Sequence, residues 1–438
     1  MRFYDRENEL ASLNRTLEQS KAESRMTVVM GRRRIGKTEL IRKCDDDTIL
    51  YFFVARKTEA LLCEDFIQEA EEKLNVPMGR FTRFSEIFVF LLKLSSERPF
   101  TLIIDEFQDF QRVNSAIFSE IQRDWDLYHH QGKLNLILSG SVFTMMKRIF
   151  EDYSEPLYGR ANNILTVSPF TINTLKIILN DHNSEYNNED LLALYAVSGG
   201  VAWYVSMLMD RGYTTKESII GYLTEKDSPL LTEGRNILIE EFGPDYSTYF
   251  SILTCISSGL HNRGEMENIL QYNNIGSYLT RLEKYYGLIK QHQPIFAKTN
   301  SRNIKYKLND EFLTIWFRFI YRYQSYIESG SLNQLSRIIS RDYATYSGFA
   351  LERYFETKLR ESGQYTRIGK FWDRKGENEI DLIAVNEIDN TAEIYEIKRN
   401  EKKFDKSLLD RKINYLIKQC PQIKNMTIRS GALSIEDM

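Results

Sequence analysis

The stretch that decides the fold is residues 25–38, R-M-T-V-V-M-G-R-R-R-I-G-K-T, in which an apolar run ends at Gly31 and leads into a helical segment. Residues 31–38 match the pattern G-x-x-x-x-G-K-[ST] in the strand, glycine loop and helix context that the pattern requires. In such a loop, backbone N–H groups and the positive end of the helix surround a phosphate. We therefore expect a phosphate-binding loop, with Lys37 neutralising the β and γ phosphates and the Thr38 hydroxyl binding Mg²⁺.

Further apolar runs follow this loop without polar alternation, and helical stretches separate them. The runs are 49–54, 100–104 and 134–138. This pattern is typical of a parallel sheet that is covered on both faces. We expect an α/β fold whose first part, residues 1–165, is a doubly wound, parallel-sheet P-loop NTPase core.

Composition bounds the class of protein. The chain has 438 residues, 42% of them hydrophobic and 27% charged, as in a folded protein of about three domains. The net charge of -3 excludes a global basic field, so nucleic-acid binding would need a local patch. Four scattered cysteines and the lack of a long apolar run indicate a cytoplasmic protein without a signal peptide or membrane span.

Three further domains follow the core. Helical periodicity over residues 166–245 predicts a helical lid subdomain. Residues 246–335 read as three short helices and a hairpin, which is the outline of a winged helix-turn-helix. Its third helix carries no cluster of arginines, so DNA binding and a protein-docking or purely structural role both remain open. Residues 336–438 return to an α/β pattern.

Carboxylates suited to hydrolysis end the second apolar run after the loop, in L-I-I-D-E. We expect Asp105 to reach Mg²⁺ through water and Glu106 to orient the attacking water. Ser139, in the S-G-S that ends the next run, is the first choice for a γ-phosphate sensor, with Ser141 second. Arg160 is a candidate arginine finger, acting on its own nucleotide or on that of a neighbouring subunit, or else an ordinary surface arginine.

A second cluster of charges lies in the last hundred residues. A hairpin folded about Asp389 sets Asp381 opposite Ile397, which Glu396 and Lys398 flank on one face of their strand. Two carboxylates and a lysine can hold Mg²⁺ and orient water for attack on a phosphodiester. An active nuclease, an inactive nuclease-like binder and unrelated surface charge all remain open. The basic run over 398–412 favours a nucleic-acid partner over the last of these.

The motifs together resemble those of the archaeal-type ATPases of the AAA+/STAND superclass, whose C-terminal module is the domain of unknown function number 234. The matching segments are F-Y-D-R-E-N-E-L at 3–10, the glycine loop, L-I-I-D-E-F-Q at 102–108, the S-G-S turn and G-G-V at 199–201. The resemblance covers the whole chain. ATP and Mg²⁺ are the expected cofactors, and the expected nucleotide-binding residues are Gly31, Arg34, Ile35, Gly36, Lys37, Thr38 and Glu39.

The C-terminal arrangement is similar to that of PD-(D/E)xK nucleases. This resemblance implies that Glu352, on the preceding helix, joins Asp381 and Glu396 as a metal ligand and that Lys398 is catalytic.

Two functions follow from these expectations. The first is a Mg²⁺-dependent ATPase that acts on DNA, or is regulated by it, through the winged helix and the nuclease-like domain. The second is an ATP-driven switch or scaffold that binds a protein partner and carries an inactive nuclease-like domain. A homo-oligomer is required if Arg160 acts in trans. The DNA target and the activating signal are left open.

Overall fold

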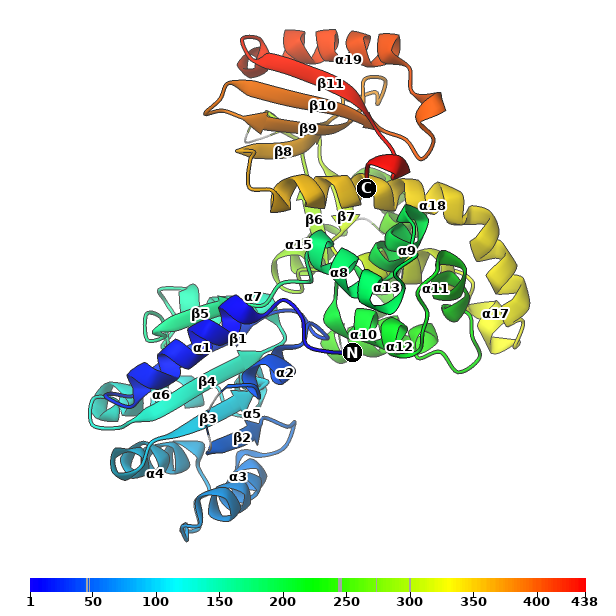
Figure 1. The fold of residues 1–438 in the computed structure, drawn as a ribbon. Helices are drawn as coiled ribbons and strands as arrows, with labels where there is room; N and C mark the ends of the chain where they lie inside the picture. The colour runs from blue at the N-terminus through cyan, green and yellow to red at the C-terminus, as the bar shows by residue number, and fades with distance from the viewer. Residues whose placement is uncertain (45, 47, 243–245, 273, 299–300) are drawn as a thin grey trace. The chain divides into compact units, whose positions relative to one another are not determined.

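The computed structural model of the chain describes residues 1–438 except 45, 47, 243–245, 273 and 299–300. The chain divides into two compact units, one of residues 2–169 and one of Met1 with residues 170–438. Each unit contains a sheet of its own, as Figure 1 shows.

The first unit is built on a five-stranded sheet in the order β2-β3-β4-β1-β5. The strands are β1 (Arg25–Met30), β2 (Ile49–Phe53), β3 (Phe100–Asp105), β4 (Leu134–Gly140) and β5 (Asn163–Thr166). All neighbouring pairs are parallel. The parallel sheet of a P-loop NTPase core is therefore confirmed, and β5, which sequence reasoning missed, adds one edge strand beside β1.

Helices cover both faces of this sheet. Alternate side chains of β1, Met26, Val28 and Met30, pack with α3, α4 and α6 in one apolar core. Val29, between them, is buried on the opposite face, where α1 contacts β1 and β4. The helices of this unit are α1 (Glu7–Ser20), α2 (Lys37–Ile41), α3 (Glu59–Leu74), α4 (Phe84–Glu97), α5 (Phe110–Val113), α6 (Ile117–Tyr128) and α7 (Phe143–Glu151).

The second unit begins with a helical region. Its helices are α8 (Ile172–His182), α9 (Asn188–Ser198), α10 (Ala202–Asp210), α11 (Lys216–Tyr222) and α12 (Leu230–Phe242). Every residue of α9 from Asp190 to Ser198 is buried, so this helix is the centre of the region. Asn187 caps it by accepting hydrogen bonds from the backbone N–H groups of Glu189 and Asp190.

Three more helices and a hairpin follow. They are α13 (Tyr246–Ser257), α14 (Arg263–Leu270), α15 (Gly276–Lys284), β6 (Ile289–His292) and β7 (Lys305–Leu308). The two strands pair antiparallel. These elements occupy the positions expected for a winged helix, and that interpretation stays a prediction.

A long helix leads into the C-terminal region. After α16 (Glu311–Ile315), a π-helical turn (Trp316–Tyr321) and α17 (Gln324–Glu328), helix α18 runs over Leu332–Glu361. It spans the predicted domain boundary between 335 and 336, and the limits of the four predicted domains stay predictions. None of the described helices has both the length and the apolar character to span a bilayer.

The C-terminal sheet has the order β11-β10-β9-β8. Its strands are β8 (Arg367–Phe371), β9 (Ile380–Asn386), β10 (Thr391–Ile397) and β11 (Thr427–Leu433), with α19 (Lys406–Gln419) between the last two. Strands β10 and β11 are parallel, and the other pairs are antiparallel. Leu409 and Leu416 of α19 share an apolar core with β9 and β10, while α18 contacts β8, β9 and β10.

The register of the β9–β10 hairpin differs by one residue from the expected one. Leu382 pairs with Tyr395, so the next step along the ladder brings Asp381 opposite Glu396 instead of Ile397. The physical reason is the turn, which contains four residues between Asn386 and Thr391 and therefore has no single residue at its centre. Its last residue, Asn390, adopts a left-handed φ of 53°.

Candidate functional site

The phosphate-binding loop connects β1 to α2. Arg34 and Gly36 have φ angles of 71° and 95°, so the chain turns sharply before the helix begins at Lys37. Gly31 packs so closely that a Cβ there would lie 2.7 Å from the carbonyl oxygen of Val167. The loop thus has the strand, tight turn and helix geometry of a phosphate cradle.

Lys37 lies inside this cradle. Its Nζ donates to the carbonyl oxygens of Gly31, at 2.9 Å, and Arg32, at 3.0 Å. Burial lowers the pKa of Lys37 to about 8, although the negative charges of Glu106 and Asp105 act to raise it. The ammonium group is therefore held inside the loop by carbonyl oxygens, which phosphate oxygens can replace. Of the other expected nucleotide contacts in the loop, Ile35 is buried and Glu39 is exposed.

Asp105, at the end of β3, meets the start of α2. Its Oδ2 atom accepts from Thr38 Oγ1 at 3.0 Å and from Tyr51 Oη at 2.6 Å. Burial and this hydrogen bond raise the pKa of Tyr51. A hydroxyl and a carboxylate are oxygen donors of the kind that Mg²⁺ prefers, so Thr38 and Asp105 fit the ion that a P-loop uses.

Glu106 begins the turn after β3 with a left-handed φ of 54°. Its Oε2 atom accepts from Gln108 Nε2 and from Ser141 Oγ, both at 2.6 Å. Ser141, the second choice from the sequence, therefore contacts the expected base. Ser139 does not, because β4 continues to Gly140 and keeps it within the sheet, fully buried. Its Oγ has no hydrogen-bond partner among the described residues.

Arg160 is held by another residue of the core. Its Nε and Nη2 atoms donate to Asp126 of α6 at 3.2 Å and 2.9 Å, and its Nη1 donates to the Tyr158 carbonyl oxygen. A role as an arginine finger would require this ion pair to open.

The predicted C-terminal residues form a charged cluster at the end of β10. Lys398 Nζ donates to Glu396 Oε2 at 2.8 Å and to Asp381 Oδ2 at 3.4 Å. The Ile397 backbone N–H also donates to Asp381, at 2.9 Å. Burial alone would lower the pKa of Lys398, but the hydrogen bond to Glu396 and the charge of Asp381 raise it overall. Lys398 is therefore held protonated beside both carboxylates.

Two further lysines, which sequence reasoning did not assign to this cluster, neutralise its carboxylates. Lys412 of α19 donates to Glu396, and Lys370 of β8 donates to Glu352 of α18. Glu352 lines a hollow of about 490 Å³ together with Lys398, so the helix carboxylate and the catalytic lysine of the expected motif share one cavity. In the sequence, Lys412 stands out only as part of the basic run over 398–412. That run predicts a nucleic-acid partner and does not indicate a pairing with Glu396.

The set of side chains gathered most tightly for metal binding lies elsewhere. Among the described residues, only Glu23, His129 and His130 form a group of three donors whose ligand atoms lie within 4.8 Å of one another. Glu23 precedes β1, whereas the phosphate loop follows that strand, so the group lies about 20 Å from the loop at the opposite end of the strand. Asp381, Glu396 and Glu352 are paired with lysines instead.

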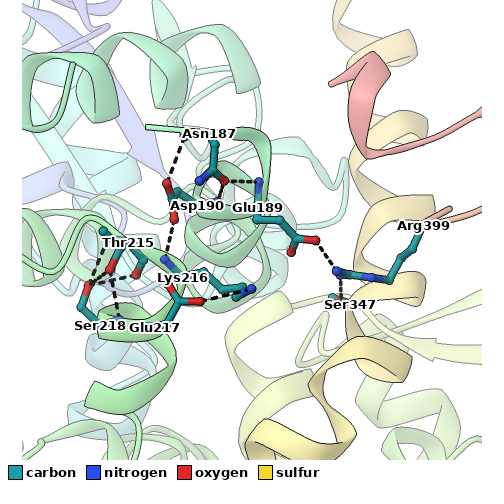
Figure 2. A network of polar contacts seen from close by, with 9 residues as sticks. All are labelled: Asn187, Glu189, Asp190, Thr215, Lys216, Glu217, Ser218, Ser347 and Arg399. Carbon is teal, nitrogen blue, oxygen red and sulfur yellow. Dashed lines mark hydrogen bonds and ion pairs between the residues drawn. The ribbon is translucent and has the colours of Figure 1, made fainter. Parts of the chain in front are cut away.

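Arg399, the residue after Lys398, points away from the carboxylates. Figure 2 shows its guanidinium between Glu189 of α9 and Ser347 of α18, and it hydrogen-bonds to both. The same α9 terminus is joined to α11, because Asp190 Oδ1 accepts from the Lys216 backbone N–H at 2.7 Å. Residues at the end of β10 thus contact both the charged cluster and the helical region.

Comparisons with known proteins match two parts of the chain. A family model described as an ATPase domain predominantly from Archaea matches residues 3–208, and one described as archaea bacterial proteins of unknown function matches 316–408. The uncharacterized protein MJECL04 of Methanocaldococcus jannaschii is 30% identical over 408 residues, which are 90% of this chain and 87% of that protein.

A solved ATPase structure is similar in fold to this chain. The Walker-type ATPase PABY2304 of Pyrococcus abyssi is 20% identical, with a TM-score of 0.53 over 72% of this chain and 96% of that chain. The ORC2 protein of Aeropyrum pernix, solved as ADPNP-ADP complexes, is 15% identical, with a TM-score of 0.47 over 75% of this chain and 95% of that chain.

The contact between Tyr51 and Asp105 gives a first prediction. Replacing Tyr51 with Phe removes a hydrogen bond that orients the carboxylate, so the Mg²⁺ concentration for half-maximal binding of a fluorescent ATP analogue should rise about tenfold. Tyr153→Phe, at an exposed tyrosine of the same unit, is the control. Coincident Mg²⁺ curves for Tyr51→Phe and the wild type would show that the contact does not position Asp105.

Proposed function

The chain belongs to the family of archaeal ATPases that join an ATPase domain to a C-terminal domain of unknown function, and on this premise we propose that it is a Mg²⁺-dependent ATP hydrolase controlling a nuclease-like domain. The observation that supports ATP hydrolysis is the contact between the phosphate-binding loop and the end of β3. There Thr38 Oγ1 donates to Asp105 Oδ2, and Glu106 is the next residue after Asp105.

ATP hydrolysis requires a cradle for the phosphates and a base for water. The loop N–H groups and Lys37 would bind the β and γ phosphates, and Thr38 and Asp105 would hold Mg²⁺, which neutralises the developing charge. Glu106 would accept a proton from the attacking water. Ser141 and Gln108 both donate to the same Glu106 oxygen, so they are positioning residues that leave its second oxygen for that water.

The ATPase half predicts a separation between binding and turnover. Lys37→Ala should abolish both, because it removes the only buried cation of the loop among the residues that the structure describes. Glu106→Gln should retain ATP binding and lose at least about 100-fold in turnover. Phosphate release and analogue binding measure the two properties, with Glu97→Gln as an exposed control. A wild type that releases no more phosphate than Lys37→Ala contradicts the proposal.

The nuclease half rests on the cluster at the end of β10. Asp381 and Glu396 accept hydrogen bonds from Lys398, and this set can hold a divalent cation and activate water. In the proposed reaction, water adds to the phosphorus atom of a phosphodiester, one P–O bond breaks, and the leaving oxygen takes a proton. Glu352 would also hold the cation, once its carboxylate is no longer paired with Lys370.

Degradation of DNA tests this half. Purified wild type with Mg²⁺ should cut plasmid or linear DNA, and both Asp381→Ala and Lys398→Ala should remove the cutting. Asp389→Ala, an exposed aspartate of the same hairpin, should cut like the wild type. Equal cutting by all four preparations identifies a contaminant. A wild type that hydrolyses ATP without cutting DNA favours the alternative function, a switch that binds a protein partner.

The contact of Arg399 with α9 supports control of this cluster by the helical region. Glu189→Gln keeps the shape of the side chain but removes the charge that holds Arg399. A charged hydrogen bond of this kind contributes about 1.5–3 kcal/mol. We therefore expect unchanged ATP turnover and a roughly tenfold smaller effect of ATP on DNA cutting.

The matched control for this variant is Glu185→Gln, at an exposed position just before α9. Both variants are assayed with ATP, with ADP and without nucleotide. If Glu189→Gln responds to ATP as the wild type does, the contact does not transmit the nucleotide state.

A further inference from the structure

A second hollow lies beside the charged cluster, on the same long helix. It has a volume of about 310 Å³ and is lined by Arg318 and Arg322 near the π-helical turn and by Arg341, Asp342 and Thr345 of α18. Arg318 and Arg322 are four residues apart, as are Arg341 and Thr345. Each pair therefore lies on one face of its helical segment, and the two faces meet in the hollow.

The charge of this hollow is positive. Asp342 accepts both hydrogen bonds of the Arg341 fork, at 2.7 Å and 2.8 Å. That hydrogen bonding, together with the charges of Arg341, Arg318 and Arg322, lowers the pKa of Asp342. Three guanidinium groups and one carboxylate leave a net charge of +2. Planar guanidinium groups match phosphate oxygens in geometry as well as in charge.

The two hollows are neighbours on α18. Thr345 lines both of them, and Phe349, Glu352 and Lys398 line the first, larger one. The helix residues Arg341, Thr345, Phe349 and Glu352 follow one another at spacings of four, four and three, which is a single stripe on one face. From Arg341 to Glu352 the helix rises about 16 Å. That is the length of a few nucleotides of an extended strand.

Phe349 interrupts this polar stripe with an aromatic ring. Its side chain is 58% exposed, although most aromatic residues of the unit are buried. An aromatic side chain exposed beside a basic groove is the combination with which proteins hold single strands. A ring between an arginine-lined hollow and a cluster of carboxylates is placed to stack on an unpaired base.

We propose that this face of α18 is a binding track for an unpaired nucleic-acid strand. One phosphate lies among Arg318, Arg322 and Arg341, a base stacks on Phe349, and the strand continues toward Glu352 and Lys398. The track rests on the proposed nuclease function, since it delivers the strand to that cluster. A duplex fits it less well, because its bases are stacked on one another and cannot reach Phe349.

Fluorescence anisotropy with a labelled 12-nucleotide oligothymidylate tests the track, using the full chain without divalent cations so that nothing is cut. Phe349→Ala should weaken binding about tenfold, and Phe349→Trp should restore it. Arg322→Gln should weaken binding and reduce the slope of log K against log salt by about 0.7, because one phosphate is no longer neutralised. Ile388→Ala and Arg429→Gln, at exposed positions that line neither hollow, should bind like the wild type.

Each outcome of this experiment supports or overturns the track. A wild type that does not bind the oligonucleotide, or Phe349→Ala and Arg322→Gln proteins that bind it normally, overturns it. So does displacement of the strand by polyglutamate at equal charge, which would identify an acidic protein segment as the occupant. Thermal melting of each variant checks its folding.

Failure of the track is distinguishable from failure of the nuclease. Suppose that the wild type cuts DNA and Asp381→Ala does not, while Phe349→Ala and Arg322→Gln bind and cut like the wild type. Then the track is wrong and the nuclease proposal stands. If the track variants lose binding and no preparation ever cuts, the track stands as a binding surface and the nuclease proposal fails.

Discussion

The hydrogen bond between Thr38 Oγ1 and Asp105 Oδ2 joins two segments that are 67 residues apart in the chain. It exists because parallel strands place their carboxyl ends at one edge of a sheet. Strand β4 lies between β1 and β3, and it brings Ser141 to the same edge, where the serine contacts Glu106. The loop, the oxygens proposed to bind Mg²⁺ and the proposed base therefore depend on the strand order more than on any single residue.

A comparable constraint operates at the end of β10. Just after β10 ends at Ile397, Lys398 reaches the carboxylates while the next residue, Arg399, reaches α9 and α18. A shift of α9 relative to the C-terminal sheet would act on a residue directly bonded to the proposed catalytic lysine. In the proposed control, this arrangement would couple the two regions through one peptide unit, without a long pathway of intermediate contacts.

Local motifs were predictable from the sequence, and contacts across the chain were not. The loop at Gly31–Thr38 is a continuous run of residues, and so is the pair Asp105 and Glu106. The chemistry expected of each motif therefore follows from its residue types and their positions. The choice of Ser139 over Ser141 depended on where β4 ends, and strand ends vary by a residue or two without visible signals. Tyr51 carries no motif, and only the pairing of β2 with β3 brings it to Asp105.

The ion pairs of the charged cluster were likewise only partly predictable from the sequence. Spacing along the hairpin indicated that Asp381, Glu396 and Lys398 converge, although the turn shifted the register by one residue. Nothing in the sequence indicated that Lys412 and Lys370 pair with Glu396 and Glu352, since those pairs depend on how α19 and β8 pack. Helix α18 passes from one predicted domain into the next as an uninterrupted helix, and the domain limits stay predictions.

The lysine pairs bear on how the proposed nuclease would be kept inactive. Glu352, Asp381 and Glu396 each have a lysine partner, so a divalent cation must compete with ammonium groups that are already bound. Breaking a buried pair is costly unless both partners find new ones. A nucleic-acid phosphate offers Lys398 and Lys412 such partners, and each lysine that moves to phosphate leaves a carboxylate for the cation. Cation and strand would then bind cooperatively, so the cluster would assemble for catalysis only when a strand lies on it.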